Sequence, residues 1–291
     1  MSGPARWSSP AGLIRLSGPD TLRFLHGQSS QDLALAPQGA CLATCLISPT
    51  ARMRGLALVL VQPGGAELVL LAGDGAAIHQ ALDRVLFPAD QVSLGPVETA
   101  TLVRLIDTDP VTTTAAEGLL RPAVDLGGGR GAPLLLLRSG EALPAWAEAL
   151  PELSADQAER QRLRHGLPAA PGELNDSTNP FELGLADWVS LSKGCYVGQE
   201  TLAKLSTYDG VKQQLRHWRC GPAPAEACAP GSSLSTAAGE RAGVISSSLA
   251  GPEGWEGLAL VRRSALEASN LQSGGTLLSL SVPLGFSAPP G

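Results

Sequence analysis

The apolar runs of this sequence have the length of β-strands, and this feature constrains the fold more than any other. Three of them, residues 40–48, 55–62 and 66–73, follow one another with only a polar loop and a Pro-Gly-Gly turn between them. Strands so close in sequence, with turn residues between them, pair antiparallel as a meander. No apolar run reaches about eighteen residues, so no helix is predicted to span a membrane.

Helical patterns accompany these strands. Residues 11–35 read as a short strand followed by a helix, with Asp20 as a candidate N-cap. Apolar side chains recur at helical spacing within residues 75–87. Residues 155–165 have the polar composition of a solvent-facing helix that ends at Gly166. Strands followed by helices, in this order, predict an α+β fold and not a parallel doubly wound sheet.

The sequence changes character after residue 213. Short β-like runs are separated there by Gly, Pro and Ser turns, and only residues 264–268 have a helical pattern. This pattern is typical of a small all-β, barrel-like module. We therefore predict an α+β domain over residues 1–215 and a β-barrel over residues 216–291. A further break near residues 95–100 is an alternative division of the first domain.

Charge and cysteine content exclude several classes of protein. The formal net charge is −6 and the arginines are dispersed, which gives no support for a nucleic-acid partner. The first residues lack the apolar core of a secretory signal. Five cysteines, an odd number without such a signal, favour a reducing compartment, so we expect a cytoplasmic protein. Neither the cysteines nor the four histidines have the spacing of metal ligands, and no metal site is predicted.

Four of the cysteines form two pairs in sequence. Cys41 and Cys45 lie four residues apart in one predicted strand and are expected to be small core residues. Cys220 and Cys228 flank a segment rich in Pro and Ala, and the sequence assigns them no role.

Lysine and tyrosine are confined to one short stretch. The chain has three lysines against eighteen arginines, and two tyrosines; the five residues, Lys193, Tyr196, Lys204, Tyr208 and Lys212, all fall within twenty positions. An ammonium is not equivalent to a planar guanidinium, so a lysine kept in an arginine-rich chain marks a place where the difference can matter. The search for a functional site therefore begins here.

The stretch opens with the residues KGCYVGQE, 193–200. If residues 193–197 are extended, Lys193, Cys195 and Val197 share one face. An ammonium on that face would stabilise the thiolate of Cys195 and make it a nucleophile or a soft metal ligand. An inert buried cysteine beside a solvent-facing lysine fits the same residues, and the sequence leaves both interpretations open.

Other charged residues of the stretch also have two interpretations. Glu200 begins a predicted helix, where a carboxylate is favoured by the helix dipole; it could also accept paired hydrogen bonds from a planar N–H/NH₂ edge. Lys204, Lys212, Arg216 and Arg219 form a local basic run. This run could hold an anionic tail or form a solvated basic face.

The octapeptide KGCYVGQE resembles the signature of the YgfZ family of folate-binding proteins, which share their fold with aminomethyltransferase, the T-protein of the glycine cleavage system. The segment LSGPDTLRFLHGQSSQDL resembles the family's opening, with Gly27, Gln28 and Asp32 at matching positions. RHGLP, NPFELGLADWVSLS and the later GVISSS and LALVRR also resemble family segments. The resemblance covers nearly the whole chain and is most specific in the signature.

The resemblance implies an α+β, aminomethyltransferase-like body with a C-terminal barrel, tetrahydrofolate as the cofactor, and a role in assembling or repairing iron–sulfur clusters. It implies that Cys195, with Lys193 beside it, carries the chemistry. The expected folate-binding residues are Glu200, Tyr196, Gln199, Gln28 and Arg216. Partners would be iron–sulfur enzymes or cluster carriers, with neither nucleic acid nor membrane, and the chain would be a monomer. A bound cluster is conceivable, although the ligand spacing does not indicate one.

Two departures bear on the reaction. The transferases need an acid in the early strands, yet this chain has no Asp or Glu between Asp32 and Glu67. This argues against a conventional aminomethyltransferase. The basic pair expected just before the barrel is replaced by Lys212-Gln213. A folate-dependent C1 transferase and a non-catalytic scaffold for an iron–sulfur partner are the alternative functions.

Overall fold

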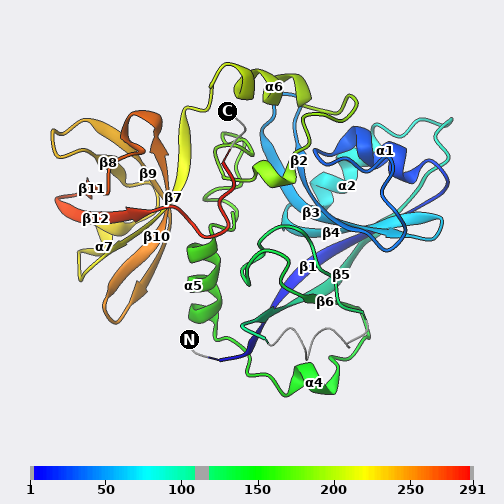
Figure 1. Ribbon diagram of the computed structural model, residues 1–291, viewed down its shortest axis with the longest axis horizontal. Coiled ribbons are helices and arrows are strands. Elements are labelled where there is room, and N and C mark those ends of the chain that lie inside the picture. The colour runs from blue at the N-terminus through cyan, green and yellow to red at the C-terminus, as the bar shows by residue number, and fades with distance from the viewer. Residues whose placement is uncertain (1–2, 109–117, 289–291) are drawn as a thin grey trace.

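Two β-structures dominate the computed structural model, which describes residues 3–108 and 118–288. A six-stranded sheet and a closed six-stranded barrel lie side by side, with helix α5 (Ala155–His165) between them (Figure 1). We call the part built on the sheet the body. The α+β fold predicted from the sequence, with a small barrel near the C-terminus, is confirmed. The division into domains at residues 215 and 216 stays a prediction.

The sheet of the body is antiparallel throughout, with the strand order β2-β3-β4-β1-β5-β6. Its strands are β1 (Ala5–Ser17), β2 (Cys41–Ile47), β3 (Met53–Gln62), β4 (Gly65–Gly73), β5 (Ser93–Ile106) and β6 (Leu134–Arg138). The predicted meander is confirmed as β2, β3 and β4. Strand β1 is longer than predicted, because its polar first half pairs with β5 as far as Ile106.

The two faces of this sheet are covered differently. Helices α1 (Thr21–Gln28) and α2 (Gly75–Asp83) bury Phe24, Leu25, Ile78 and Leu82 against one face. Helix α2 is shorter than the predicted 75–87, and Val85 beyond its end is 37% exposed. The opposite face packs against residues from α5, the loops after it and the barrel. Cys45 is buried in this second core and Cys41 packs against it, as predicted.

The barrel closes in the order β10-β7-β12-β11-β8-β9. Its strands are β7 (Gln213–Cys220), β8 (Ser233–Ser235), β9 (Arg241–Gly251), β10 (Gly254–Arg262), β11 (Asn270–Ser273) and β12 (Thr276–Ser281), with α7 (Ala225–Cys228) and the 3₁₀ turn η2 (Arg263–Ala265) in its connections. Trp218 fills its centre, and the indole N–H donates to the Leu258 carbonyl oxygen at 3.1 Å. This hydrogen bond satisfies the one polar group of a fully buried side chain.

Helix α5 faces solvent only over part of its surface, so the predicted solvent-facing helix is correct only in part. The helix begins with a capping box of Ser154 and Gln157 and ends at Gly166, as expected, but Leu163 is fully buried. Arg160 reaches the barrel and lies 2.6 Å from the Glu256 carboxylate. The polar side chains of α5 are used for contacts with distant parts of the chain, so their polarity did not indicate exposure.

The chain beyond β12 returns to the body. The Leu284 N–H donates to the Arg164 carbonyl oxygen at 2.9 Å, and the Ser287 N–H donates to that of Gly184 at 2.8 Å. This tail runs beside α5 and links the two β-structures a second time (Figure 1). In the part of the chain that the structure describes, no helix is long and apolar enough to cross a membrane.

Candidate functional site

The signature residues 193–198 form a loop between the 3₁₀ turn η1 (Ala186–Trp188) and helix α6 (Gln199–Thr207). The Val197 N–H donates to the Gly27 carbonyl oxygen at 3.1 Å, near the end of α1. Gly198 has φ 81° and lies against Ser48, just after β2. The loop is therefore held between the end of α1 and the end of β2.

Lys193 fixes this loop to α1. Its ammonium donates to the carbonyl oxygens of His26, Ser29 and Gln31 at 2.5, 2.7 and 2.7 Å. Three acceptors match the three N–H donors of an ammonium, and carbonyls at a helix C-terminus favour a cation. The ammonium also lies 4.3 Å from the centre of the Tyr196 ring. Burial lowers the pKa of Lys193 to about 8.

Cys195 is exposed, whereas Lys193 is buried. The predicted shared face of Lys193, Cys195 and Val197 is wrong, because residues 193–198 are bends and a turn and not an extended strand. The ammonium turns inward to the carbonyls of α1, and the thiol points to solvent. The other interpretation of these residues, an inert buried cysteine, is also wrong about position, because Cys195 is exposed.

Gln199 lies inside this arrangement and Glu200 lies outside it. The Gln199 side-chain amide donates to the Lys193 carbonyl oxygen at 3.0 Å and closes the loop on itself. Glu200 is 83% exposed, and its carboxylate lies 2.7 Å from the Lys204 ammonium. That contact lowers the pKa of Glu200. Gln28 is half-buried at the last position of α1.

Tyr196 contributes a buried aromatic ring to the same cluster. Within the described residues its hydroxyl oxygen is buried and has no hydrogen-bond partner. Burial raises the pKa of this phenol, with a smaller contribution from Cys45. A phenol usually finds a partner when it is buried, so this hydroxyl is a polar group available to a ligand or a water molecule.

A cavity of 710 Å³ lies where the body meets the barrel, beyond the end of α6. Four cations line it: Arg52, Lys212, Arg262 and Arg263. Glu182 also lines it; burial raises the pKa of its carboxyl group, and its Oε2 accepts from the Asn179 N–H at 3.1 Å. Asp209 lines the cavity as well and pairs with Arg263, so the cavity combines a largely cationic rim with the buried carboxylate of Glu182.

The predicted basic run is divided among different places. Lys204 pairs with Glu200 on α6, and Lys212 lines the large cavity. Arg216 is buried on β7, with its guanidinium 5.4 Å from the centre of the Phe286 ring, and Arg219 is 62% exposed. Among the predicted site residues, the fold brings together Lys193, Tyr196 and Gln199, and places Arg216 apart from them.

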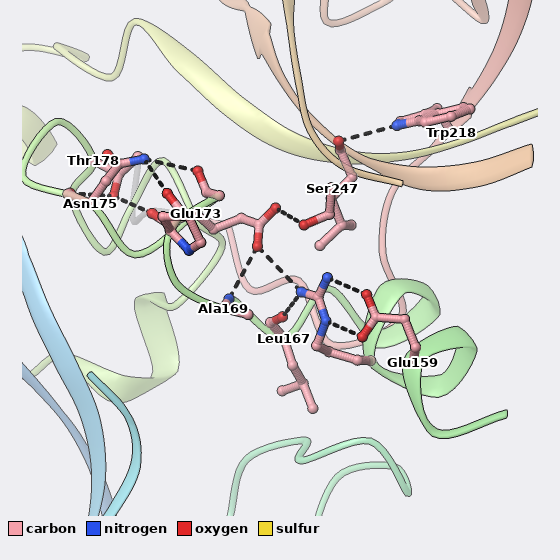
Figure 2. Close-up of polar contacts among 12 residues, drawn as sticks. Glu159, Leu167, Ala169, Glu173, Asn175, Thr178, Trp218 and Ser247 are labelled. Atoms are coloured by element: carbon pink, nitrogen blue, oxygen red, sulfur yellow. Dashed lines mark hydrogen bonds and ion pairs between the residues drawn. The ribbon is translucent and has the colours of Figure 1, made fainter. Parts of the chain in front are cut away.

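Sequence analysis missed a buried ionic cluster around Glu173, in the loop after α5 (Figure 2). Its Oε1 accepts from the Ser247 hydroxyl of β9 at 2.7 Å, and its Oε2 accepts from the Ala169 N–H at 3.1 Å. The Arg162 guanidinium contacts the same oxygen at 3.3 Å and also pairs with Glu159. The only signal in the sequence was an acid in a loop rich in Pro, Asn and Ser, and Asp176 and Glu182 share that loop.

The early strands carry no acidic side chain. Strands β2 and β3 lie wholly between Asp32 and Glu67, the interval without Asp or Glu. Asp32 contacts His26 at 3.3 Å, and Glu67 is held by Arg15 and Arg138. Within residues 3–108 and 118–288, no three His, Cys, Asp or Glu side chains gather as a metal site would require.

Comparison with solved structures identifies the fold. The crystal structure of glycine cleavage system aminomethyltransferase T from Bartonella henselae matches 99% of this chain and 88% of its own, with a TM-score of 0.76 and 18% identity. This chain has the aminomethyltransferase fold. At that identity the likeness shows the fold and no activity.

One curated relative matches most of this chain. "Putative transferase At1g60990, chloroplastic" of Arabidopsis thaliana is 29% identical over 289 residues, which cover 89% of this chain and 65% of the relative. The chain therefore spans less than two thirds of that protein. No family model matches this chain.

Proposed function

We propose that this chain binds a reduced folate and that its Cys195 thiol serves the assembly or repair of iron–sulfur clusters. The construction of the signature loop carries the proposal. Lys193 and Tyr196 are buried and fix the loop, and the residue between them that bears a reactive group is turned to solvent. A reactive side chain held by a rigid surrounding shell is the arrangement that a functional site needs.

The large cavity fits the chemistry of a folate. Its 710 Å³ lies within the range of about 300–1,000 Å³ that small-ligand sites occupy. A folate ends in a glutamate tail whose carboxylates match the cations Arg52, Lys212, Arg262 and Arg263. When bound, a reduced folate would supply a carrier for one-carbon groups. This chain's own residues would bind and orient it.

Two carboxylates are candidates for the pterin ring, which offers a 2-amino group and a ring N–H as paired donors. Glu200 is in the signature but must first leave Lys204. Glu182 lies in the cavity, where its carboxylate accepts from the Asn179 N–H and is also hydrogen-bonded to the Gln213 side chain. The buried Glu182 is favoured by its position, because hydrogen bonds to a carboxylate shielded from water are stronger.

Cys195 supplies the thiol chemistry of the proposal. Thiolates are the ligands that iron–sulfur clusters prefer, and an exposed thiol can reach a cluster or a thiol on another protein. With a single cysteine in the loop, the proposed contact is transient and made with an iron–sulfur enzyme or a cluster carrier. Lys193 acts as a positioning residue in this scheme, since its donors are already used by α1.

A folate-dependent C1 transferase is the second candidate, favoured by the fold and by the name of the Arabidopsis relative, a putative transferase. The acid-free strands β2 and β3 weigh against it, because they leave the early strands without a group to act on the amine. The third candidate function is a scaffold that holds an iron–sulfur partner and does not need folate.

Titration with reduced folates, followed by calorimetry, tests the binding step on wild type, Glu182→Gln and Glu200→Gln. We expect tenfold or greater weakening in Glu182→Gln only, since a carboxylate that accepts paired hydrogen bonds contributes about 1.5–3 kcal/mol. Weakening in Glu200→Gln alone would return the pterin contact to the signature. No binding to wild type would remove folate from the proposal.

Iron–sulfur enzyme activities in cells that carry Cys195→Ala test the second step. Cys41→Ala, a half-buried cysteine on β2, is the matched control. We expect lower activities with Cys195→Ala and normal ones with Cys41→Ala. A turnover assay with a glycine-derived aminomethyl donor separates the transferase, and product formation by wild type would favour that alternative.

The proposal keeps the cytoplasm as the compartment and a monomer as the working form. The Arabidopsis relative is, by its name, a chloroplast protein. Cell fractionation and sedimentation of the purified chain test these two points.

A further inference from the structure

Two cysteines of the barrel lie in contact, although they were assigned no role from the sequence. Cys220 ends strand β7 and Cys228 ends helix α7, and their sulfur atoms are 3.7 Å apart. All five cysteines lie in the described part of the chain as free thiols. A disulfide needs the sulfurs at about 2.05 Å, so a small movement of one side chain would close the bond.

The two thiols differ in their access to solvent. Cys220 is half-buried and lines a surface cavity of 310 Å³ at the end of the barrel, together with Trp255. Cys228 is completely buried in the barrel core. Burial, with the neighbouring Cys220, raises the pKa of the Cys228 thiol to about 12. A reagent from solvent therefore meets Cys220 first.

A short segment joins the two cysteines. Residues 221–224 form a short connection, and a side chain added at Gly221 would meet nothing within 4 Å. The Trp255 indole N–H donates to the Ala223 carbonyl oxygen at 3.2 Å and holds this connection to the barrel.

We propose that Cys220 and Cys228 form a dithiol that reacts with a small peroxide and closes to an intramolecular disulfide. The Cys220 sulfur attacks one peroxide oxygen, the O–O bond breaks, and the departing oxygen leaves as water, which gives a sulfenic acid. The Cys228 sulfur then attacks the Cys220 sulfur, and the hydroxyl leaves with the Cys228 proton as a second water. One peroxide is reduced, and two thiols are oxidised to one disulfide.

The charges of the cavity favour a neutral oxidant. Arg160 and Arg219 line it together with Glu253 and Glu256, so the lining carries as many acids as bases. Such a balance neither attracts nor repels a charged molecule strongly, and hydrogen peroxide is small enough to enter. This inference concerns the barrel and does not depend on the proposed function of Cys195.

Mass spectrometry after limited hydrogen peroxide treatment tests the proposal. The full chain carries Cys195→Ser to remove the exposed thiol. Its variants Cys220→Ser and Cys228→Ala are treated in parallel, and remaining thiols are alkylated after denaturation. We expect the parent to lose two alkylatable thiols together. The peptide that contains both residues should carry a disulfide between Cys220 and Cys228. The Cys228→Ala variant should instead trap a sulfenic acid at Cys220 that reacts with dimedone.

The Cys220→Ser variant is the matched control, because its remaining thiol at position 228 is buried and should stay reduced. The proposal is overturned if Cys220 and Cys228 stay reduced in the parent while Cys195 is oxidised in wild-type protein treated in parallel. Equal sulfenic acid at Cys220 with and without Cys228 would also overturn it, since the second thiol would then have no part in the reaction.

Discussion

The Ser247 hydroxyl donates a 2.7 Å hydrogen bond to the carboxylate of Glu173, and this contact joins strand β9 of the barrel to the loop that follows α5. Glu173 has no exposed surface, so the contact lies in the interior of the junction (Figure 2). The other carboxylate oxygen lies 3.3 Å from the Arg162 guanidinium. A charge buried at this depth is tolerated only because its oxygens are paired.

The first prediction is that Glu173→Ala lowers the free energy of unfolding by about 3 kcal/mol, because Arg162 loses a buried partner and the Ala169 N–H loses its acceptor. Ser247→Ala removes one hydrogen bond to a charged group and should cost about 1.5 kcal/mol. Urea unfolding followed by circular dichroism measures both. Equal losses in the two variants would contradict a special cost for removing the buried carboxylate from Arg162.

Lys193→Met is expected to lower the free energy of unfolding by about 3 kcal/mol, because three carbonyl oxygens at the end of α1 lose their donors. The release of the loop should also change the rate at which Cys195 reacts with an alkylating reagent. Lys204→Met, on the exposed face of α6, is the matched control and should change neither quantity measurably. Unfolding and alkylation that match wild type in Lys193→Met would show that the ammonium does not hold the loop.

The sequence predicted those parts of the fold whose cause is local. Strands β2, β3 and β4 follow from apolar runs and turn residues, and the end of α5 follows from Gly166. The predicted exposure of α5 was wrong in part, because Arg160 of this helix pairs with Glu256, a residue 96 positions away.

The predicted geometry of the signature was wrong for the same reason. Lys193 is drawn to carbonyls more than 160 positions earlier in the chain, so the local geometry of an extended strand does not apply. The signature could still be located from the sequence, because lysine and tyrosine are confined to its neighbourhood. The division of its side chains into buried and exposed required the contacts with α1.

Acid should weaken the sheet through Glu67. The Arg138 guanidinium makes paired contacts with this carboxylate at 2.5 and 3.0 Å and lowers its pKa below the ordinary value of 4.5. Since the folded pKa is depressed, the stabilisation is complete well above pH 4.5 and is lost as the pH falls below it towards the folded value.

The measurement is the free energy of unfolding as a function of pH. Glu67→Gln should flatten the profile below pH 4.5, and Arg138→Leu should flatten it as well, because the carboxylate loses the main partner that depresses its pKa and with it the acid-labile stabilisation. A Glu67→Gln profile as steep as that of wild type in this range would assign the acid loss to other groups.

The last prediction concerns the two glycines of the signature, which have different roles. Gly198 has φ 81°, and a side chain there would place its Cβ 2.7 Å from the Ser48 carbonyl oxygen and 2.8 Å from Ile47 Cδ1. Gly194 has its nearest neighbour, His26 Nε2, at an ordinary 3.5 Å. We expect Gly198→Ala to lower the free energy of unfolding by about 2 kcal/mol or more, since the left-handed conformation alone costs about 1–2 kcal/mol and the contact adds to it.

Gly194→Ala is the matched control, with a cost below about 1 kcal/mol because its added methyl group finds an ordinary contact. Thermal unfolding of the two variants gives the comparison, and alkylation of Cys195 reports whether the loop has moved away from β2. Gly198 holds α6 against Ser48, so its substitution should alter the alkylation rate as well as the stability. A Gly198→Ala chain as stable as Gly194→Ala would mean that the loop does not depend on its contact with the end of β2.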